Sequence, residues 1–369
     1  MLKLAFRNLF RHKLRTGITL AAIAFGVAVI ILSGGFVEDM FVQLRESTIH
    51  SQLGHIQVYK SGYYAQGRRD PYRYLIATPE MLEKKLKKLP HVAKVMARIQ
   101  FDGMLSNTRA DLPIEGEGVA KALQLRPGDY ASLILTTPDG ALNSMEFKVV
   151  GVFRSFAKDY DDHAIRIVLP TAQDLLNTRS VLSLVLLLDN TLATDKVAAA
   201  LKAQLPSNEY EVKTWIELAD FYGKTVELYS RYFGVMMIII LIMVLLGVLN
   251  SIILTVHERT GEFGTLMAFG NRGPELFRLI FWENILLALF ACAAGLVLGV
   301  MLAKVVSAIG IPMPPPPNMN SGYMAHIRVV PTVVLTSVLT GFVAAMLAAA
   351  LAARRVIRLP IIEALRHNI

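Results

Sequence analysis

Residues 232–276 read YFGVMMIIILIMVLLGVLNSIILTVHERTGEFGTLMAFGNRGPEL, and this stretch decides the fold. Its first part, residues 232–256, is an uninterrupted apolar run that is long enough to cross a bilayer as one helix. A short charged segment follows, with His257, Glu258, Arg259 and Glu262, before the chain turns apolar again. Such a segment between two hydrophobic runs is too short to be a domain and indicates a loop that joins two membrane helices.

Three further apolar runs complete a set of four predicted spans. The first follows the basic sequence RNLFRHKLR and contains no charge at residues 16–37. A cleaved signal peptide is the alternative, but the run is longer than a typical signal-peptide core and no A-x-A site closes it. We therefore predict an uncleaved first helix. The predicted transmembrane helices are residues 16–45, 229–256, 274–306 and 328–354.

The composition supports a membrane protein and excludes several other classes. The chain is 54% hydrophobic and only 18% charged, a bias that a soluble core of this size does not need. The net charge is +9, and much of the basic charge lies at the edges of the apolar runs. Aromatic and basic residues are not interleaved as in RNA-binding proteins, so we expect no nucleic-acid partner. Cys292 is the single cysteine, which excludes an intrachain disulfide and a cysteine metal cluster.

Three basic clusters give the topology of the four spans. They lie at residues 7–15, 259–272 and 354–366, and four spans place all three on the same side of the membrane. The positive-inside rule makes that side cytoplasmic. Both termini are therefore expected in the cytoplasm, with residues 1–15 as an amphipathic N-terminus and residues 355–369 as a tail.

The long segment between the first two spans, residues 46–228, is expected to be a folded outer domain. It contains strand-like runs such as GHIQVYK and SLVLLLD, and helix-like runs such as TPEMLEKKLKKL and TDKVAAALKAQL. This mixture predicts an α+β domain. The fold class is thus an α-helical membrane protein with four transmembrane helices and a large α+β extracytoplasmic domain between helices 1 and 2. Residues 307–327 form a short outer loop that is rich in proline.

The charged segment at residues 257–272 has two interpretations. It is either a solvated turn at the membrane surface, or a short helix that inserts into a cleft of a cytoplasmic partner. On a helix, Glu258, Glu262 and Thr265 are neighbours, and apolar residues lie nearby. Gly270 would end this helix before the third span begins.

A resemblance favours the second interpretation. The residues that carry it are Asn250, Val256, Glu258-Arg259, Glu262-Phe263-Gly264, Met267-Ala268-Phe269-Gly270 and Glu283. This pattern resembles the coupling-helix signature of the FtsX/MacB/LolC-LolE superfamily, the permeases of type VII ABC transporters. The sequences GHIQVYKSGYY and VVGVFRSFAKDYDDHAIRIVLPTAQDLLN resemble the lipoprotein-releasing LolC/LolE branch more than the other branches.

The resemblance implies a mechanism, partners and a location. Two copies of a cytoplasmic ABC ATPase would bind ATP and magnesium, and this chain would hold no cofactor. A second permease, either the same chain or a paralogue, would complete a dimer in the bacterial inner (plasma) membrane, with the large domain in the periplasm. ATP-driven motion would extract a lipoprotein or lipid-like cargo from the outer leaflet for a periplasmic carrier. The ATPase-coupling residues would be Glu258, Arg259, Glu262, Phe263, Gly264, Met267 and Gly270.

Apolar residues at the outer ends of the first two spans are the candidates for cargo contact. Flexible methionines and aromatic rings suit variable acyl chains, although ordinary helix packing explains the same spacing. The candidates are Phe36, Met40, Phe41, Leu44, Tyr229, Phe233, Met236, Met237 and Ile240. Two other functions remain open: an FtsX-like regulator that activates a cell-wall hydrolase without transport, and MacB-like efflux.

Other candidate sites are weaker. The sequence contains no G-x-x-x-x-G-K-[ST] motif and no catalytic triad pattern, so we expect no enzyme activity in this chain. The run KDYDDHAI clusters Asp159, Asp161, Asp162 and His163, but it lacks the glycine and terminal glutamate of an EF-hand, so we expect a solvated loop and no metal. Glu283 is interpreted as the only carboxylate well inside a span, paired with a basic residue of the coupling segment.

Overall fold

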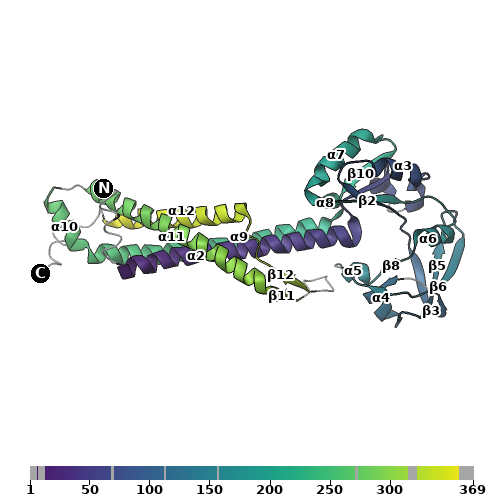
Figure 1. The fold of residues 1–369 in the computed structure, drawn as a ribbon, viewed down its shortest axis with the longest axis horizontal. Helices are drawn as coiled ribbons and strands as arrows, with labels where there is room; N and C mark the ends of the chain where they lie inside the picture. Colours follow the sequence, from purple (N-terminus) through teal and green to yellow (C-terminus); the bar gives the residue numbers. More distant parts are fainter. Residues whose placement is uncertain are drawn as a thin grey trace. The chain divides into compact units, whose positions relative to one another are not determined.

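The computed structural model describes residue 6 and residues 13–67, 70–111, 114–155, 158–270, 273–314 and 322–356. The chain divides into two compact units, a helical unit and an α+β unit (Figure 1). The helical unit comprises Met1–Phe41, Glu227–Pro312 and Met324–Ile369, and the α+β unit comprises Val42–Val226 and Met313–Tyr323. We expected the mixed domain at residues 46–228. The main segment of the α+β unit begins and ends a few residues before these bounds.

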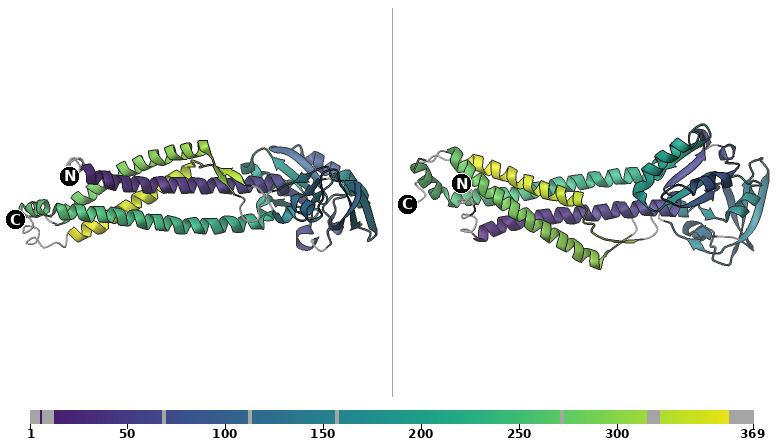
Figure 2. Two further views of the ribbon diagram at one scale, coloured as in Figure 1. Left: turned by 90° about the horizontal axis from the view of Figure 1, so that it is seen from below. Right: turned by 45° about the horizontal axis from the view of Figure 1, so that its top comes forward.

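Four helices in the described part of the chain are long and apolar enough to span a membrane (Figure 2). They confirm the predicted number and order of spans, with a mixed domain between the first and the second. The first helix extends only slightly past the span predicted at 16–45, whereas the second begins well before the span predicted at 229–256. The long helices are α2 (Lys13–Thr48), α9 (Asp220–Glu258), α11 (Gly273–Ile309) and α12 (Pro331–Val356); the short α10 (Thr260–Ala268) lies between α9 and α11.

Close packing through small residues holds the helical unit together. Gly295 of α11 lies so near α2 that an added Cβ would be 2.7 Å from the carbonyl oxygen of Ala24 and 2.9 Å from Val27. Ala344 and Ala348 of α12 are fully buried in the apolar core that also contains Val27. Small residues allow helix backbones to approach, which strengthens dispersion contacts where lipid supplies no hydrophobic driving force.

A buried carboxylate secures the non-helical segment that leads into α12. Asp39 of α2 is 1% exposed, and its two oxygens accept hydrogen bonds from the Arg328 guanidinium at 2.8 Å and the His326 amide at 3.0 Å. The Ser307 hydroxyl accepts from the Ile327 amide, and the Gly35 carbonyl accepts from the Arg328 amide. Asp39 therefore joins Glu283 as a carboxylate inside a membrane helix, which the sequence interpretation did not anticipate.

The α+β unit contains a four-stranded antiparallel sheet in the order β10-β1-β9-β2. Helices α3 (Pro79–Leu86) and α7 (Thr194–Gln204) contribute to the apolar core on one face, where Ile56, Leu184 and Leu186 are completely buried. The runs predicted as strands and helices here do form them, which confirms the α+β class. The strands are β1 (Ile56–Lys60), β2 (Val92–Arg98), β9 (Ser183–Leu188) and β10 (Tyr210–Thr214).

A second group of strands in the α+β unit has its own core. Strands β3 (Gly103–Asp111), β5 (Tyr130–Thr136) and β6 (Leu142–Lys148) close into a small barrel packed with Leu133 and Leu176. A smaller sheet has the order β7-β4-β8. The other strands and α-helices of the described residues are β4 (Ile114–Gly116), β7 (Val152–Phe153), β8 (Ile165–Arg166), α4 (Glu117–Ala122), α5 (Lys158–Asp161), α6 (Leu169–Leu175), α8 (Trp215–Leu218), β11 (Ile311–Met313) and β12 (Tyr323–Ala325).

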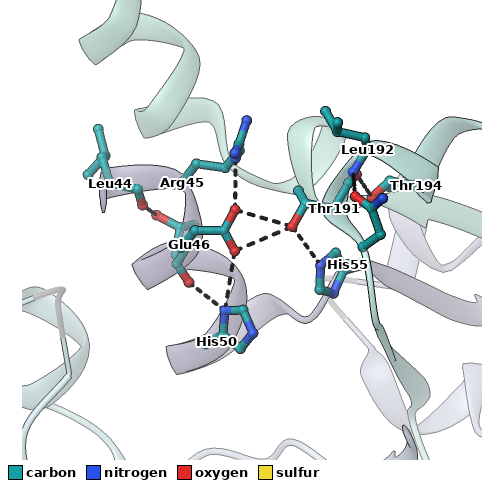
Figure 3. A network of polar contacts seen from close by, with 10 residues as sticks. Leu44, Arg45, Glu46, His50, His55, Thr191, Leu192 and Thr194 are labelled. Carbon is teal, nitrogen blue, oxygen red and sulfur yellow. Dashed lines mark hydrogen bonds and ion pairs between the residues drawn. The ribbon is translucent and has the colours of Figure 1, made fainter. Parts of the chain in front are cut away.

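A polar network fixes the C-terminal end of α2 within the α+β unit (Figure 3). The Leu188 amide donates to Nδ1 of His55 at 3.1 Å, so the ring proton lies on Nε2, which donates to the Thr191 hydroxyl at 3.1 Å. Thr191 in turn donates to the carboxylate of Glu46 at 3.2 Å. Burial lowers the pKa of His55 below its ordinary value, which agrees with this neutral tautomer.

The acidic run predicted as a solvated loop is instead partly internal. Asp161 is completely buried, and both of its oxygens accept a hydrogen bond from the Ser155 amide, at 3.0 and 2.9 Å. Gly116 packs directly against its backbone, where an added Cβ would lie 2.2 Å from the Asp161 carbonyl oxygen. The expectation of a solvated loop is therefore wrong for Asp161. No group of metal-binding side chains occurs among the described residues.

Two glycine substitutions test the helix packing. We expect Gly295→Ala to destabilise the protein by about 1–3 kcal/mol, because its methyl group would overlap the backbone of α2. Gly247→Ala is the matched control, since a Cβ at that position of α9 meets nothing within 4 Å. Thermal unfolding in one detergent would measure both. Equal unfolding temperatures for the two variants would contradict the packing described here.

Candidate coupling site

The sequence between α9 and α11 forms a helix break followed by a short helix. Helix α9 ends at Glu258, and α10 starts at Thr260, so Arg259 occupies the break. The Thr260 hydroxyl donates to the carbonyl of His257 at 2.8 Å, which occupies one of the acceptors left free at the end of α9. The backbone thus changes direction at a single residue.

The side chain of Arg259 points inward from this break. Arg259 is only 5% exposed, and its Nη1 donates to both carboxylate oxygens of Glu283 on α11 at 3.1 Å. Its Nε donates to Glu262 of α10 at 3.0 Å. The predicted pairing of Glu283 with a basic residue of the coupling segment is confirmed. One guanidinium therefore joins α10 to α11 at the point where α9 ends.

Electrostatics keep Arg259 charged despite its burial. Burial lowers the pKa of Arg259, but the negative charges of Glu283 and Glu262 oppose this, and the result lies above its ordinary value. A buried ion pair costs desolvation to form, but removing one partner leaves the other charge unpaired, at about 3–5 kcal/mol. The cluster is therefore a rigid connection that tolerates loss of neither charge well.

The structure places the other predicted coupling residues around this anchor. Glu258 is exposed and Gly264 is buried. Gly270 has a φ of 92° in the turn that follows α10, a conformation that favours glycine. Phe263 and Met267 belong to α10, but their side chains lie outside the described part of the structure.

The residue just after α10 is a large uncovered side chain. Phe269 is 85% exposed, and its amide donates to the Thr265 carbonyl of α10. Its ring is therefore held at the end of a short helix without burial in the helical unit. Aromatic side chains are enriched at protein–protein interfaces, so Phe269 is a candidate contact residue.

The predicted cargo residues do not share one environment. Ile240 is buried and Met236 and Met237 pack against the core of the helical unit, so these three face the neighbouring helices. Leu44 is buried in the α+β unit. The remaining candidates are half-buried: Phe36, Met40, Phe41, Tyr229 and Phe233. Their role in cargo contact stays a prediction.

Two protein families match separate parts of the chain. Residues 16–131 match the MacB-like periplasmic core domain, and residues 234–361 match the FtsX-like permease C-terminal domain. The second match spans the break at Arg259, the short helix α10 and the partner carboxylate Glu283. The first match covers α2 and the start of the α+β unit.

Several characterised and uncharacterised permeases are similar to this chain. An uncharacterised ABC transporter permease of Methanocaldococcus jannaschii is 22% identical, over 46% of this chain and 43% of that protein. The macrolide export ATP-binding/permease protein MacB of Rhodospirillum rubrum is 27% identical, over 59% of this chain and 34% of that protein. The lipoprotein-releasing system transmembrane protein LolE of Haemophilus influenzae is 20% identical, over 51% and 46%. The matched regions thus span less than half the length of each relative.

The described residues contain four candidate membrane helices, a large α+β unit between the first and the second, and the short helix α10 between the second and the third. This arrangement and the two matching families define a multi-pass permease. The chain belongs to the FtsX/MacB/LolC-LolE superfamily of ABC transporter permeases. The two families that match this chain are a permease C-terminal domain and a periplasmic core domain.

Neutralising Glu283 tests the anchor. We expect Glu283→Gln to lower the unfolding temperature markedly, because Arg259 would stay buried while Glu262, its other ion-pair partner among the described residues, is half-exposed. Glu262→Gln removes the same charge from a side chain that is 36% exposed, so its effect should be smaller. Thermal unfolding of both variants in detergent measures this order. A larger effect of Glu262→Gln would contradict the assignment of Glu283 as the main partner.

Proposed function

We propose that this chain is the permease subunit of an ABC system in which a separate cytoplasmic ATPase drives motion of the α+β unit. Two ATPase copies bind at α10, and a second permease, either the same chain or a paralogue, completes the assembly. The motion extracts a lipoprotein or another lipid-like cargo from the outer leaflet of the inner membrane. A periplasmic carrier then receives the cargo.

The observation that carries this proposal is the anchored helix α10. Arg259 ties α10 to α11, so a force applied to α10 reaches the membrane helices without loss in a flexible loop. The exposed Phe269 beside it offers an apolar contact for a partner. Helices α2 and α9 run without interruption from the helical unit into the α+β unit, which suits them to transmit motion.

Lipid-like cargo is supported by the apolar, methionine-containing ends of α2 and α9 and by the similarity to LolE. Efflux of the MacB kind is the second candidate, favoured by the match of residues 16–131 to the MacB-like core domain and by the MacB relatives. An FtsX-like regulator that moves nothing is the third, and the match of residues 234–361 is compatible with it.

Substitution of the exposed aromatic residue tests the partner site. We expect the tagged wild-type chain, extracted from its native membranes, to carry an ATP-binding subunit in native mass spectrometry. Phe269→Asp should lose this subunit because a charge would replace the apolar contact. Leu142→Asp is the matched control: Leu142 is 79% exposed but lies in the α+β unit, so this variant should keep the subunit.

Each alternative result has a defined meaning. A wild-type chain that carries no ATP-binding subunit would refute the proposed function. If Phe269→Asp keeps full occupancy, the ATPase contacts the chain elsewhere. The same spectra separate the cargo classes, since an acylated adduct supports lipoprotein extraction, whereas a small amphiphile supports efflux. A cell-wall hydrolase bound with no cargo supports the regulatory function.

A further inference from the structure

The second face of the four-stranded sheet is largely buried and carries polar side chains next to Val185 and Met96. Alternation along the strands places Ile56 and Leu186 on the face that packs with α3 and α7. The opposite face carries one row of cross-strand partners at the end of the sheet. In this row Arg98 of β2 lies opposite Ser183 of β9, and Ser183 lies opposite Tyr59 of β1.

Ser183 lacks the hydrogen bond that a buried hydroxyl normally makes. Its side chain is completely buried, and Oγ has no hydrogen-bond partner within the described residues. The neighbouring Tyr59 does not supply one, because its hydroxyl donates to Oε1 of Gln57. A buried polar group without a partner is costly and rare, so it indicates a ligand or water that completes the site.

Arg98 beside it is a half-buried cation. In the part of the chain that the structure describes, no carboxylate forms an ion pair with its guanidinium. Burial lowers the pKa of Arg98 below its ordinary value; Tyr160 and Tyr59 oppose this, and the positive charge of Arg166 adds to it. The Arg98 guanidinium is therefore near enough to the Arg166 guanidinium for the two positive charges to repel each other, and both groups lie near Tyr160.

Arg166 of β8 is held in a fixed plane. Its guanidinium carbon lies 4.3 Å from the ring centroid of Phe153 and 5.6 Å from that of Tyr160, and Nη2 donates to the Ser51 carbonyl at 2.7 Å. Stacking on aromatic rings orders a guanidinium before a ligand arrives, which suits planar recognition of an oxyanion. Its other N–H groups have no partner among the described residues.

The nearest acidic residue along the row does not compensate these charges. Glu211 of β10 lies opposite Tyr59, on the far side from Arg98. Its carboxylate accepts a hydrogen bond from the Tyr64 amide at 2.6 Å. The positive charge at the Arg98 end of the row is therefore not neutralised by the sheet itself.

We propose that Arg98, Arg166 and the Ser183 hydroxyl form a binding site for an oxyanion, the phosphate or carboxylate group of a ligand, in the α+β unit. The two guanidinium groups supply charge and paired donors, and the hydroxyl of Ser183 donates the hydrogen bond that it lacks in the protein. This site does not depend on the ATPase or on the cargo candidates of α2 and α9. The oxyanion is either a free small anion or the headgroup of an anionic lipid.

Calorimetric titration of the full chain in an uncharged detergent tests the site. The probes are inorganic phosphate and soluble dihexanoyl phosphatidylglycerol, at constant ionic strength. We expect saturable binding of at least one probe and a loss of about tenfold or more in affinity for Arg98→Gln. Arg179→Gln is the matched control, because Arg179 is an exposed arginine of the same unit that already pairs with Asp174. Its affinity should equal that of the wild type.

A second variant separates binding from folding. Ser183→Ala should weaken binding several-fold while the ligand-free protein unfolds at no lower temperature, since the lost hydroxyl has no partner to leave behind. If Arg98→Gln does not fold, Arg98→Lys replaces it: the charge stays, the planar fork is lost, and affinity should still fall.

The outcomes are distinct. Binding of phosphate alone supports a free anion, binding of the lipid analogue alone supports a headgroup, and binding of both supports the shared oxyanion chemistry. The proposal is overturned if neither probe binds up to about 50 mM, a range that includes weak complexes. It is also overturned if affinity is unchanged in both Arg98→Gln and Ser183→Ala.

Discussion

The bilayer allows no unpaired backbone groups, and this constraint governs the helical unit. Four helices satisfy their own amides and carbonyls, so the critical places are those where helical geometry stops. At one such place Asp39 and Ser307 accept the amides of His326 and Ile327. At another, Arg259 marks the end of α9, and its side chain is satisfied by Glu262 and Glu283. Two groups of charged side chains in the helical unit therefore lie where the helices are interrupted, and one of them connects α10 to α11.

Much of this architecture could be predicted from the order of apolar, polar and charged residues along the sequence. Length and hydropathy predict four spans, because a bilayer-spanning helix needs a continuous apolar run. Short apolar runs such as SLVLLLD predict strands, and Glu283 within a span predicts a basic partner. In each case the prediction rests on a short stretch of sequence, or on one charged side chain whose burial without a partner would cost too much free energy. The start of the second long helix was not predicted, since α9 begins at Asp220, before the apolar run of its span.

The other features depend on strand register and tertiary contacts, which the order of residues along the sequence does not reveal. Asp161 looks like a solvated acid in KDYDDHAI, yet the Ser155 amide binds its carboxylate and Gly116 packs against its backbone. The row of Arg98 and Ser183 becomes visible only when the strand pairing is known. One missed feature did have a signal: Thr214 and Glu217, in the order T-x-x-E, form a capping box that starts α8.

The strand order of the α+β unit has a consequence for biosynthesis. Strand β1 is internal to its sheet, and both of its partners come from the far end of the unit, with Ile56 paired to Leu186 and to Thr214. Until those residues leave the ribosome, β1 has two unpaired edges while α2 is already available for membrane insertion. Closing so long a loop is slow, and exposed strand edges promote aggregation. Nascent chains of this permease therefore pass through a stage in which the first helix is anchored and the sheet is incomplete, when chaperone protection matters most.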